Sequence, residues 1–306
     1  MATGASALTI VGKRRTGVSV GRALAWAGLI LILLIILVPF YWLIRTALST
    51  NRELLVNTGN PLPAGFTTVN FARVLGQVDA ATSIAAGGSG QALNFFLYLR
   101  NSAIVTALTV VGQLFCSALA AYAFARLNFP LRNQIFGLYI AALMIPGIVT
   151  LIPNYILIRN LGWLNTFQGI VAPAFLMSPF AVFFLRQFFL GINREVEEAA
   201  KIDGVSLFGS FWRIILPLSG PPLTTLGILT AIGTWNEYLW PLLVGKEENV
   251  RVLTVALGVF KSQTPQGAPD WSGLMAGALL SILPSILLFL IMGRKAINSI
   301  QFSGVK

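Results

Sequence analysis

The sequence predicts an all-α membrane protein with six transmembrane helices, and three observations carry this prediction. Of its 306 residues, 56% are hydrophobic and only 10% are charged, whereas an ordinary soluble domain has about 25% charged residues. The mean hydropathy is +0.79. Six runs without a charged side chain are each long enough to cross a bilayer, which needs about 20 mostly apolar residues.

The six predicted spans are residues 23–44, 101–125, 133–158, 160–185, 214–236 and 271–293. The first run is 22 residues long, which exceeds the apolar core of about 7–15 residues in a cleaved signal peptide. We therefore interpret it as an uncleaved anchor. Two further long runs, near residues 54–71 and 80–99, are rich in Gly, Pro, Ser and Asn, so we expect them to form loops outside the membrane.

The connections follow from the spans in order. Between the first two spans we expect loops with one short helix near residues 69–78. A tight turn at 126–132, a brief turn at 159–168, a charged stretch at 186–213 and a loop at 245–270 join the remaining spans. Four prolines are expected to kink the third and fourth spans, or to reflect ordinary proline usage in membrane helices. They are Pro146, Pro153, Pro173 and Pro179.

Basic residues predict the orientation of the chain. If both termini are cytoplasmic, 13 of the 21 Lys and Arg residues lie in inner segments, as the positive-inside rule requires. The net charge of +11 is then mainly a topology signal, and we expect no binding to nucleic acid. The predicted division is a cytoplasmic amino end with the first span and an outer loop (1–97), a five-helix membrane domain (98–293) and a cytoplasmic tail (294–306).

Composition also excludes several kinds of active site. The chain has no histidine, so a catalytic triad or zinc site built on histidine cannot form. A single cysteine, Cys116, allows no intrachain disulfide. No G-x-x-x-x-G-K-[ST] phosphate loop is present. We therefore expect a non-catalytic chain that cannot hydrolyse ATP by itself and binds no cofactor directly.

The charged stretch contains the most informative motif. Residues 195–202 should form a short helix, because acidic residues in its first turn complement the helix dipole. Asp203 and Gly204 should end it, and Ser206 can cap a second helix. That helix has an apolar stripe of Leu207, Phe208, Phe211 and Ile214. The loop either packs against its own membrane domain or docks into a groove of another protein.

A family resemblance rests on this motif. Glu198-Ala199-Ala200, then Gly204 after three residues, then Ile214-Ile215-Leu216-Pro217 after nine more resemble the cytoplasmic loop of permease subunits of binding-protein-dependent ABC importers. Residues 101–102, 120–126, 144–146, 235–240 and the ending 303–306 resemble the MalG-type permeases of carbohydrate importers. The resemblance implies the type I permease fold, with a coupling helix in this loop and the permease domain at residues 98–293.

The resemblance also implies a mechanism and partners. Glu198 and Asp203 would make polar contacts to an ATPase subunit, Ala199 and Ala200 would permit close seating, and Gly204 would provide the turn. Ile214, Leu216 and Pro217 would return the chain to the membrane. Outside this pattern, the same acids and alanines would suit an ordinary solvated helix.

The implied partners are a MalF-like second permease, a dimer of ABC ATPase subunits that carries ATP and Mg²⁺, an extracytoplasmic sugar-binding protein, the carbohydrate substrate and the lipid bilayer. The implied location is a bacterial or archaeal inner membrane.

Candidate residues for the transport pathway lie inside the spans. Glu237 is an ionisable group within an apolar run, which by default indicates a functional site. With Trp235, Asn236 and Tyr238 it suits a structural or gating role more than direct sugar contact. Asn154 and Tyr155 could hydrogen-bond or stack on a sugar, or lie at the outer surface.

Two alternative functions remain open at this stage. A secondary transporter driven by an ion gradient would usually need several ionisable groups inside the membrane, and here Glu237 is the only one. An ABC importer for a solute other than a sugar would keep the same coupling loop. A membrane-embedded enzyme is disfavoured, because no cluster of acids, nucleophiles or metal ligands occurs at one depth.

Overall fold

A computed structural model describes residues 20–57, 59–88, 90, 93–262 and 268–301. The predicted positions of the two termini concern residues 1–19 and 302–306, which lie outside this description. Three helices are long and apolar enough to cross a membrane: α1 (Val20–Ala47), α5 (Phe95–Arg126) and α16 (Trp271–Gln301). Three bent helix pairs bring the number of candidate spans to six, which confirms the predicted all-α architecture.

The bent pairs replace three of the straight spans expected from the sequence. α6 (Arg132–Ala141) with the short turn to Met144 meets α7 (Gly147–Asn160) at 101°. α8 (Phe167–Phe175) meets α9 (Pro179–Gly191) at 43°. Residues 207–218 meet α13 (Gly220–Asn236) at 76°. The third span in particular is not a rod through the bilayer, because its two halves are nearly perpendicular.

Proline explains two of these breaks. Pro146 precedes α7, and the residue before it, Ile145, is extended with ψ 114°, as the ring of a following proline requires. Pro179 begins α9, where its missing N–H is not needed, and Ser178 caps that helix. Pro153 and Pro173 lie inside α7 and α8. The chain therefore breaks at Pro146 and Pro179, whereas α7 and α8 continue through Pro153 and Pro173.

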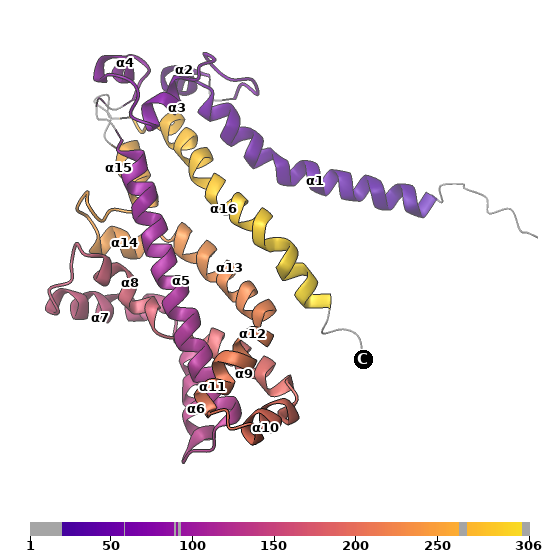
Figure 1. Ribbon diagram of the computed structural model, residues 1–306. Helices are drawn as coiled ribbons and strands as arrows, with labels where there is room; N and C mark the ends of the chain where they lie inside the picture. Colours follow the sequence, from indigo (N-terminus) through magenta and orange to yellow (C-terminus); the bar gives the residue numbers. More distant parts are fainter. Residues whose placement is uncertain (1–19, 58, 89, 91–92, 263–267, 302–306) are drawn as a thin grey trace, which may run out of the picture.

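Short helices build one end of the bundle. The expected helix near residues 69–78 is α3 (Val69–Val74), but α2 (Asn51–Val56) and α4 (Ala80–Ala85) accompany it, so the prediction of a single helix was wrong. With α15 (Leu253–Ser262) they cover what we call the α3 end of the bundle (Figure 1). The opposite end carries α10 (Arg194–Ile202) and α11 (Leu207–Ser210) and is called the α10 end.

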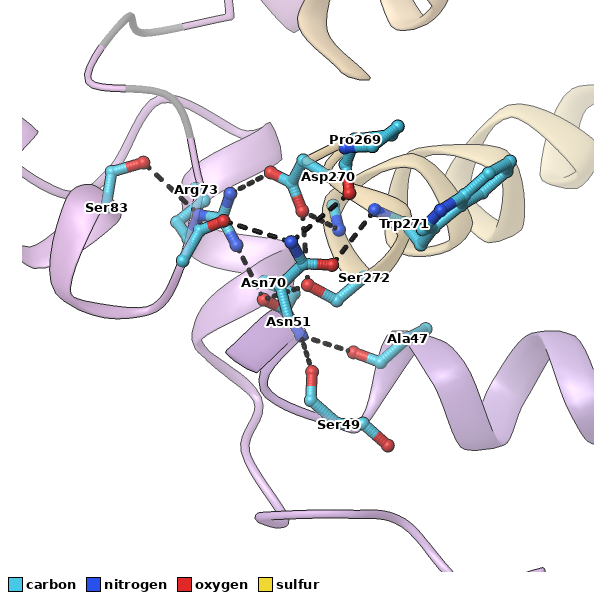
Figure 2. A network of polar contacts seen from close by, with 12 residues as sticks. Ala47, Ser49, Asn51, Asn70, Arg73, Ser83, Pro269, Asp270, Trp271 and Ser272 are labelled. Atoms are coloured by element: carbon cyan, nitrogen blue, oxygen red, sulfur yellow. Dashed lines mark hydrogen bonds and ion pairs between the residues drawn. The ribbon is translucent and has the colours of Figure 1, made fainter. Parts of the chain in front are cut away.

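A buried polar network holds the α3 end together (Figure 2). The amide nitrogen of Asn70 donates to the carbonyls of Ala47 and Ser49, at 2.8 and 2.7 Å. Asn51 donates to the carbonyl of Pro269, at 3.2 Å, and its own side-chain oxygen accepts the N–H of Trp271, at 3.1 Å. The network therefore ties the end of α1 and the loop after it to the start of α16.

Helix α5 runs through the whole bundle and contributes to all three hydrophobic clusters. Phe95 belongs to the cluster at the α3 end, Val105 to the central one and Ala121 to the one at the α10 end. α1 is different, because its only buried side chains are those of its last three residues, Arg45, Thr46 and Ala47. Figure 1 shows α1 meeting α16 at the α3 end and then diverging from the other helices.

Candidate functional site: an exposed helix and a membrane cavity

The helix expected at residues 195–202 is α10, and local signals explain both of its ends. Asn193 caps its start, since its side-chain oxygen accepts the N–H of Glu195 at 3.1 Å. At its end, the N–H of Gly204 donates to the Lys201 carbonyl and that of Val205 donates to the Ala200 carbonyl. These two bonds, with a φ of +81° at Gly204, form a Schellman motif. The glycine is required by its backbone conformation, because a side chain there would meet open space.

The second helix of the loop is shorter than expected. Ser206 caps α11 through a 3.1 Å bond from the N–H of Gly209, as predicted. The chain then passes through a π-helix (Phe211–Ile215) and α12 (Leu216–Leu218) before the bend into α13. The apolar stripe is divided between two environments: Phe211 is buried in the core, whereas Leu207 and Phe208 are 59% and 61% exposed. The loop is therefore anchored to its own domain and also presents apolar side chains to its surroundings.

Most residues predicted for coupling lie on the solvent-exposed side of this loop, which we call its free face. Glu198, Ala199, Asp203 and Gly204 are exposed, and Ala200 is half-buried. Further along, Ile214 and Leu216 are half-buried and Pro217 is exposed, at the return towards α13.

The sequence interpretation missed Ile202, whose side chain is 87% exposed at the end of α10. Its spacing of four residues from Glu198 places it on the same helix face, which is the signal that could have identified it.

A second feature is a cavity of about 540 Å³ in the middle of the bundle. Its wall combines residues of α5, α7, α8, α13 and α14 (Leu239–Val244). Polar, uncharged side chains face it, and Gln113 of α5 accepts a 2.8 Å hydrogen bond from Thr230 of α13. Trp240 lines the same cavity, and its indole N–H donates to the Ile170 carbonyl at 3.1 Å. The cavity therefore combines an aromatic ring, amides and hydroxyl groups.

The predicted pathway residues separate into two groups. Asn154 and Glu237 line the cavity, whereas Tyr155, Trp235, Asn236 and Tyr238 are not among its lining residues. Tyr155 packs against the central hydrophobic cluster. Trp235 donates its indole N–H to the Ser281 carbonyl of α16, at 3.0 Å. Asn236 bonds back to the Ile232 carbonyl, at 2.8 Å. The last two side chains thus serve local contacts between and within helices.

Glu237 is not in the middle of a helix. It is the residue after α13, and its carboxylate accepts the N–H groups of Leu239 and Trp240, at 3.1 and 3.2 Å. It therefore caps α14, which lowers the cost of a charge at this depth because the backbone donors compensate it. Within the described parts of the chain, no group of three His, Cys, Asp or Glu side chains could hold a metal ion.

Comparison with known proteins places this arrangement in a family. The family described as "binding-protein-dependent transport system inner membrane component" matches residues 113–295, a stretch that contains the loop and most of the residues that line the cavity. The chain belongs to this family of transport-system membrane components. Its members are subunits of transporters, which agrees with a permease subunit rather than an enzyme.

Individual relatives extend the similarity beyond that stretch. A probable ABC transporter permease protein, YurM of Bacillus subtilis, is 35% identical over 94% of this chain and 89% of its own length. The arabinooligosaccharide transport permease AraQ of Halalkalibacterium halodurans is 35% identical over 69% of this chain and 75% of its own. A bacterial ABC transporter that imports the acidic polysaccharide alginate has a chain of the same fold, with a TM-score of 0.74 at 21% identity, covering 94% of this chain and 99% of that one.

Proposed function

We propose that this chain is the permease subunit of an ATP-driven importer and forms half of a transmembrane pathway for a neutral carbohydrate. The observation that carries the proposal is the motif that begins Glu198-Ala199-Ala200, which folds as an exposed helix ended by the Schellman turn at Gly204. A short helix that lies outside the core of its own chain is suited to dock into another subunit.

In this proposal the free face of α10 is the coupling surface. Glu198 and Asp203 offer carboxylates to an ATPase subunit, Ala199 permits close approach and Ile202 supplies an apolar anchor. ATP and Mg²⁺ belong to a dimer of ATPase subunits. Closure of that dimer would displace α10 and switch the pathway between its inward-facing and outward-facing states.

The chemistry of the cavity supports a neutral sugar as cargo. In this proposal the sugar contacts hydroxyl and amide groups beside an aromatic ring. The lining residues that offer these groups are Gln113, Asn154, Thr230 and Trp240. Among the described residues that line the cavity, Glu237 is the only ionisable one, and its carboxylate is used as a helix cap. A wall without a basic residue is unsuited to an anionic cargo such as alginate.

The distribution of charge supports the orientation. The α10 end would face the cytoplasm of a bacterial or archaeal cell and the α3 end the outside, with both termini cytoplasmic. An extracytoplasmic sugar-binding protein would then deliver cargo at the α3 end, near residues 245–270. A second, MalF-like permease would supply the other half of the pathway.

Purification of the tagged chain from its own host's membranes tests the proposal. We expect an ATPase subunit to co-purify with the wild type and to be lost with Gly204→Val, because valine cannot readily adopt a φ of +81°. Gly137→Val is the matched control, since Gly137 also faces open space but lies within a helix, without a positive φ. An intact complex with Gly204→Val, or sugar uptake by vesicles that contain no ATP, would contradict the proposed function.

A further inference from the structure

The loop that carries α10 is fastened to α5 by two side chains that have no part in the motif. Arg126, at the end of α5, pairs with Glu197 of α10 through Nε and Oε1, 2.5 Å apart. Its Nη2 also donates to the Ile192 carbonyl just before α10, at 2.7 Å. One turn earlier, the hydroxyl of Tyr122 lies 3.2 Å from the Leu207 carbonyl at the start of α11. The two residues therefore hold the loop both before and after α10.

These contacts are buried, and the contact between Arg126 Nε and Glu197 Oε1 is an ion pair without hydrogen-bond geometry. The side chains of Arg126 and Glu197 are only 5% and 14% exposed. Tyr122 is 5% exposed, and its ring packs against Phe211 with 5.4 Å between ring centroids. Its hydroxyl also lies 3.3 Å from the second carboxylate oxygen of Glu197. Removing one member of a buried ion pair leaves the other charge uncompensated, so the pair favours a single position of the loop.

The covalent route from the loop to α13 is bent. After α11 the chain passes through the π-helix at Phe211–Ile215, and the following 76° bend separates it from α13. π-helical turns and sharp bends interrupt the regular hydrogen-bond ladder that makes a helix stiff. α5, by contrast, is a single helix of 32 residues. Apart from the short link through Ile192 and Asn193 to α9, α10 is therefore connected to an unbroken helix of the bundle by its side-chain contact with α5.

The far end of α5 is fastened as well. Asn101 donates through its amide nitrogen to the carbonyls of Asn249 and Arg251, both at 3.0 Å. The hydroxyl of Ser102 accepts the N–H of Leu253 at 2.8 Å. Between its two ends, α5 carries Gln113 on the wall of the cavity. One continuous helix thus connects the α10 loop, the cavity and the segment at residues 249–253.

We propose that Tyr122 and Arg126 are positioning residues that make α10, α11 and α5 move as one body. A displacement of α10 then reaches the cavity and residues 249–253 through α5, and not through the bent chain that leads to α13. The proposal rests on the proposed function in one respect, namely that an ATPase supplies the displacement. The fastening itself is a property of this chain alone.

Variants of the ion pair in the complete transporter test this inference. We expect Arg126→Gln to retain the ATPase but to lower sugar-stimulated ATP hydrolysis and transport at least tenfold. The exchanged pair Arg126→Glu with Glu197→Arg should recover most of this loss. Arg132→Gln is the control, because Arg132 lies beyond the end of α5 and its side chain bonds to the nearby Leu127 carbonyl and Asn128 side chain, and not to α10 among the described residues. The inference would be overturned if sugar-stimulated ATP hydrolysis in the Arg126→Gln transporter stayed within twofold of wild type. It would also be overturned if the exchanged pair did not recover the loss.

A second measurement needs no ATPase and so separates this inference from the proposed function. A nitroxide is attached to Ile202→Cys in a Cys116→Ser background of the full chain in lipid nanodiscs. We expect Arg126→Gln to increase the mobility of the label, seen as narrower electron paramagnetic resonance lines, and Arg132→Gln to leave it unchanged. Equal mobility in all three proteins would show that the ion pair does not hold α10, whether or not an ATPase binds there.

Discussion

Arg73 of α3 and Asp270, the residue before α16, form an ion pair in which both side chains are fully buried although 197 residues separate them (Figure 2). Each side-chain nitrogen of Arg73 and each carboxylate oxygen of Asp270 has a hydrogen-bond partner. Arg73 donates to Asn70 at 2.8 Å and to Ser83 at 3.2 Å, and Asp270 accepts the N–H of Gly273 at 2.8 Å. The pair therefore joins the segment between α1 and α5 to the last spanning helix.

Breaking this pair should destabilise the protein more than removing it. Asp270→Asn leaves a buried guanidinium without its counter-charge, which typically costs about 3–5 kcal/mol. The double variant Arg73→Met with Asp270→Leu removes both charges. It should unfold at a higher temperature than Asp270→Asn or Arg73→Met alone. Thermal unfolding of the detergent-purified chain measures the order. Arg52→Gln, at an exposed position, is the control; equal unfolding temperatures for Asp270→Asn and wild type would refute the prediction.

Glu237 carries a negative charge and also caps α14, and the two roles can be tested separately. Glu237→Gln keeps an oxygen that can accept from Leu239 and Trp240, so we expect transport within about threefold of wild type. Glu237→Leu removes the acceptor and should cost about 1 kcal/mol of stability, the usual value of a helix cap. Transport kinetics and thermal unfolding of the two variants give the answer. A severe loss of transport with Glu237→Gln alone would instead indicate a role for the charge.

Local features of the sequence predicted the parts of the structure that local interactions determine. The limits of α10 follow from Asn193, the acids of its first turn and Gly204, all within 12 residues of one another. The breaks at Pro146 and Pro179 follow from the proline ring, which disfavours helical backbone in the preceding residue, so that Ile145 and Ser178 are extended. The exposed face of α10 follows from helical spacing, which would also have identified Ile202.

Contacts between distant residues could not be predicted in this way. Arg126 looked like an ordinary basic residue at the end of a span, and only the fold brings it to Glu197, 71 residues later. The size of the bend between α6 and α7, 101°, depends on packing and not on Pro146 alone. In the sequence, Glu237 is a charge within an apolar run and so indicated a functional site. In the structure it lies at the break between α13 and α14, where its carboxylate caps α14.

The cavity wall should set the affinity for the cargo. Gln113→Leu removes an amide that faces the cavity and leaves the Thr230 hydroxyl without its acceptor. The loss of one hydrogen bond costs about 1 kcal/mol, which corresponds to roughly a fivefold change in affinity. We therefore expect KM for sugar uptake to rise at least fivefold. Thr106→Val is the control, because Thr106 lies on α5 but lines a different groove. If both variants change KM equally, the cavity does not contact the sugar.

The exposed side chain of Ile202 should contribute to ATPase binding but not to the fold. At 87% exposure it makes little contact within the chain, so Ile202→Ala should leave the unfolding temperature unchanged. Central apolar anchors of an interface typically cost about 2 kcal/mol when truncated, which corresponds to roughly a 30-fold rise in Kd for the ATPase. Biolayer interferometry on nanodisc-embedded complexes measures that change. Leu138→Ala, 74% exposed on α6, is the control, and an equal Kd for wild type and Ile202→Ala would place the docking surface elsewhere on the loop.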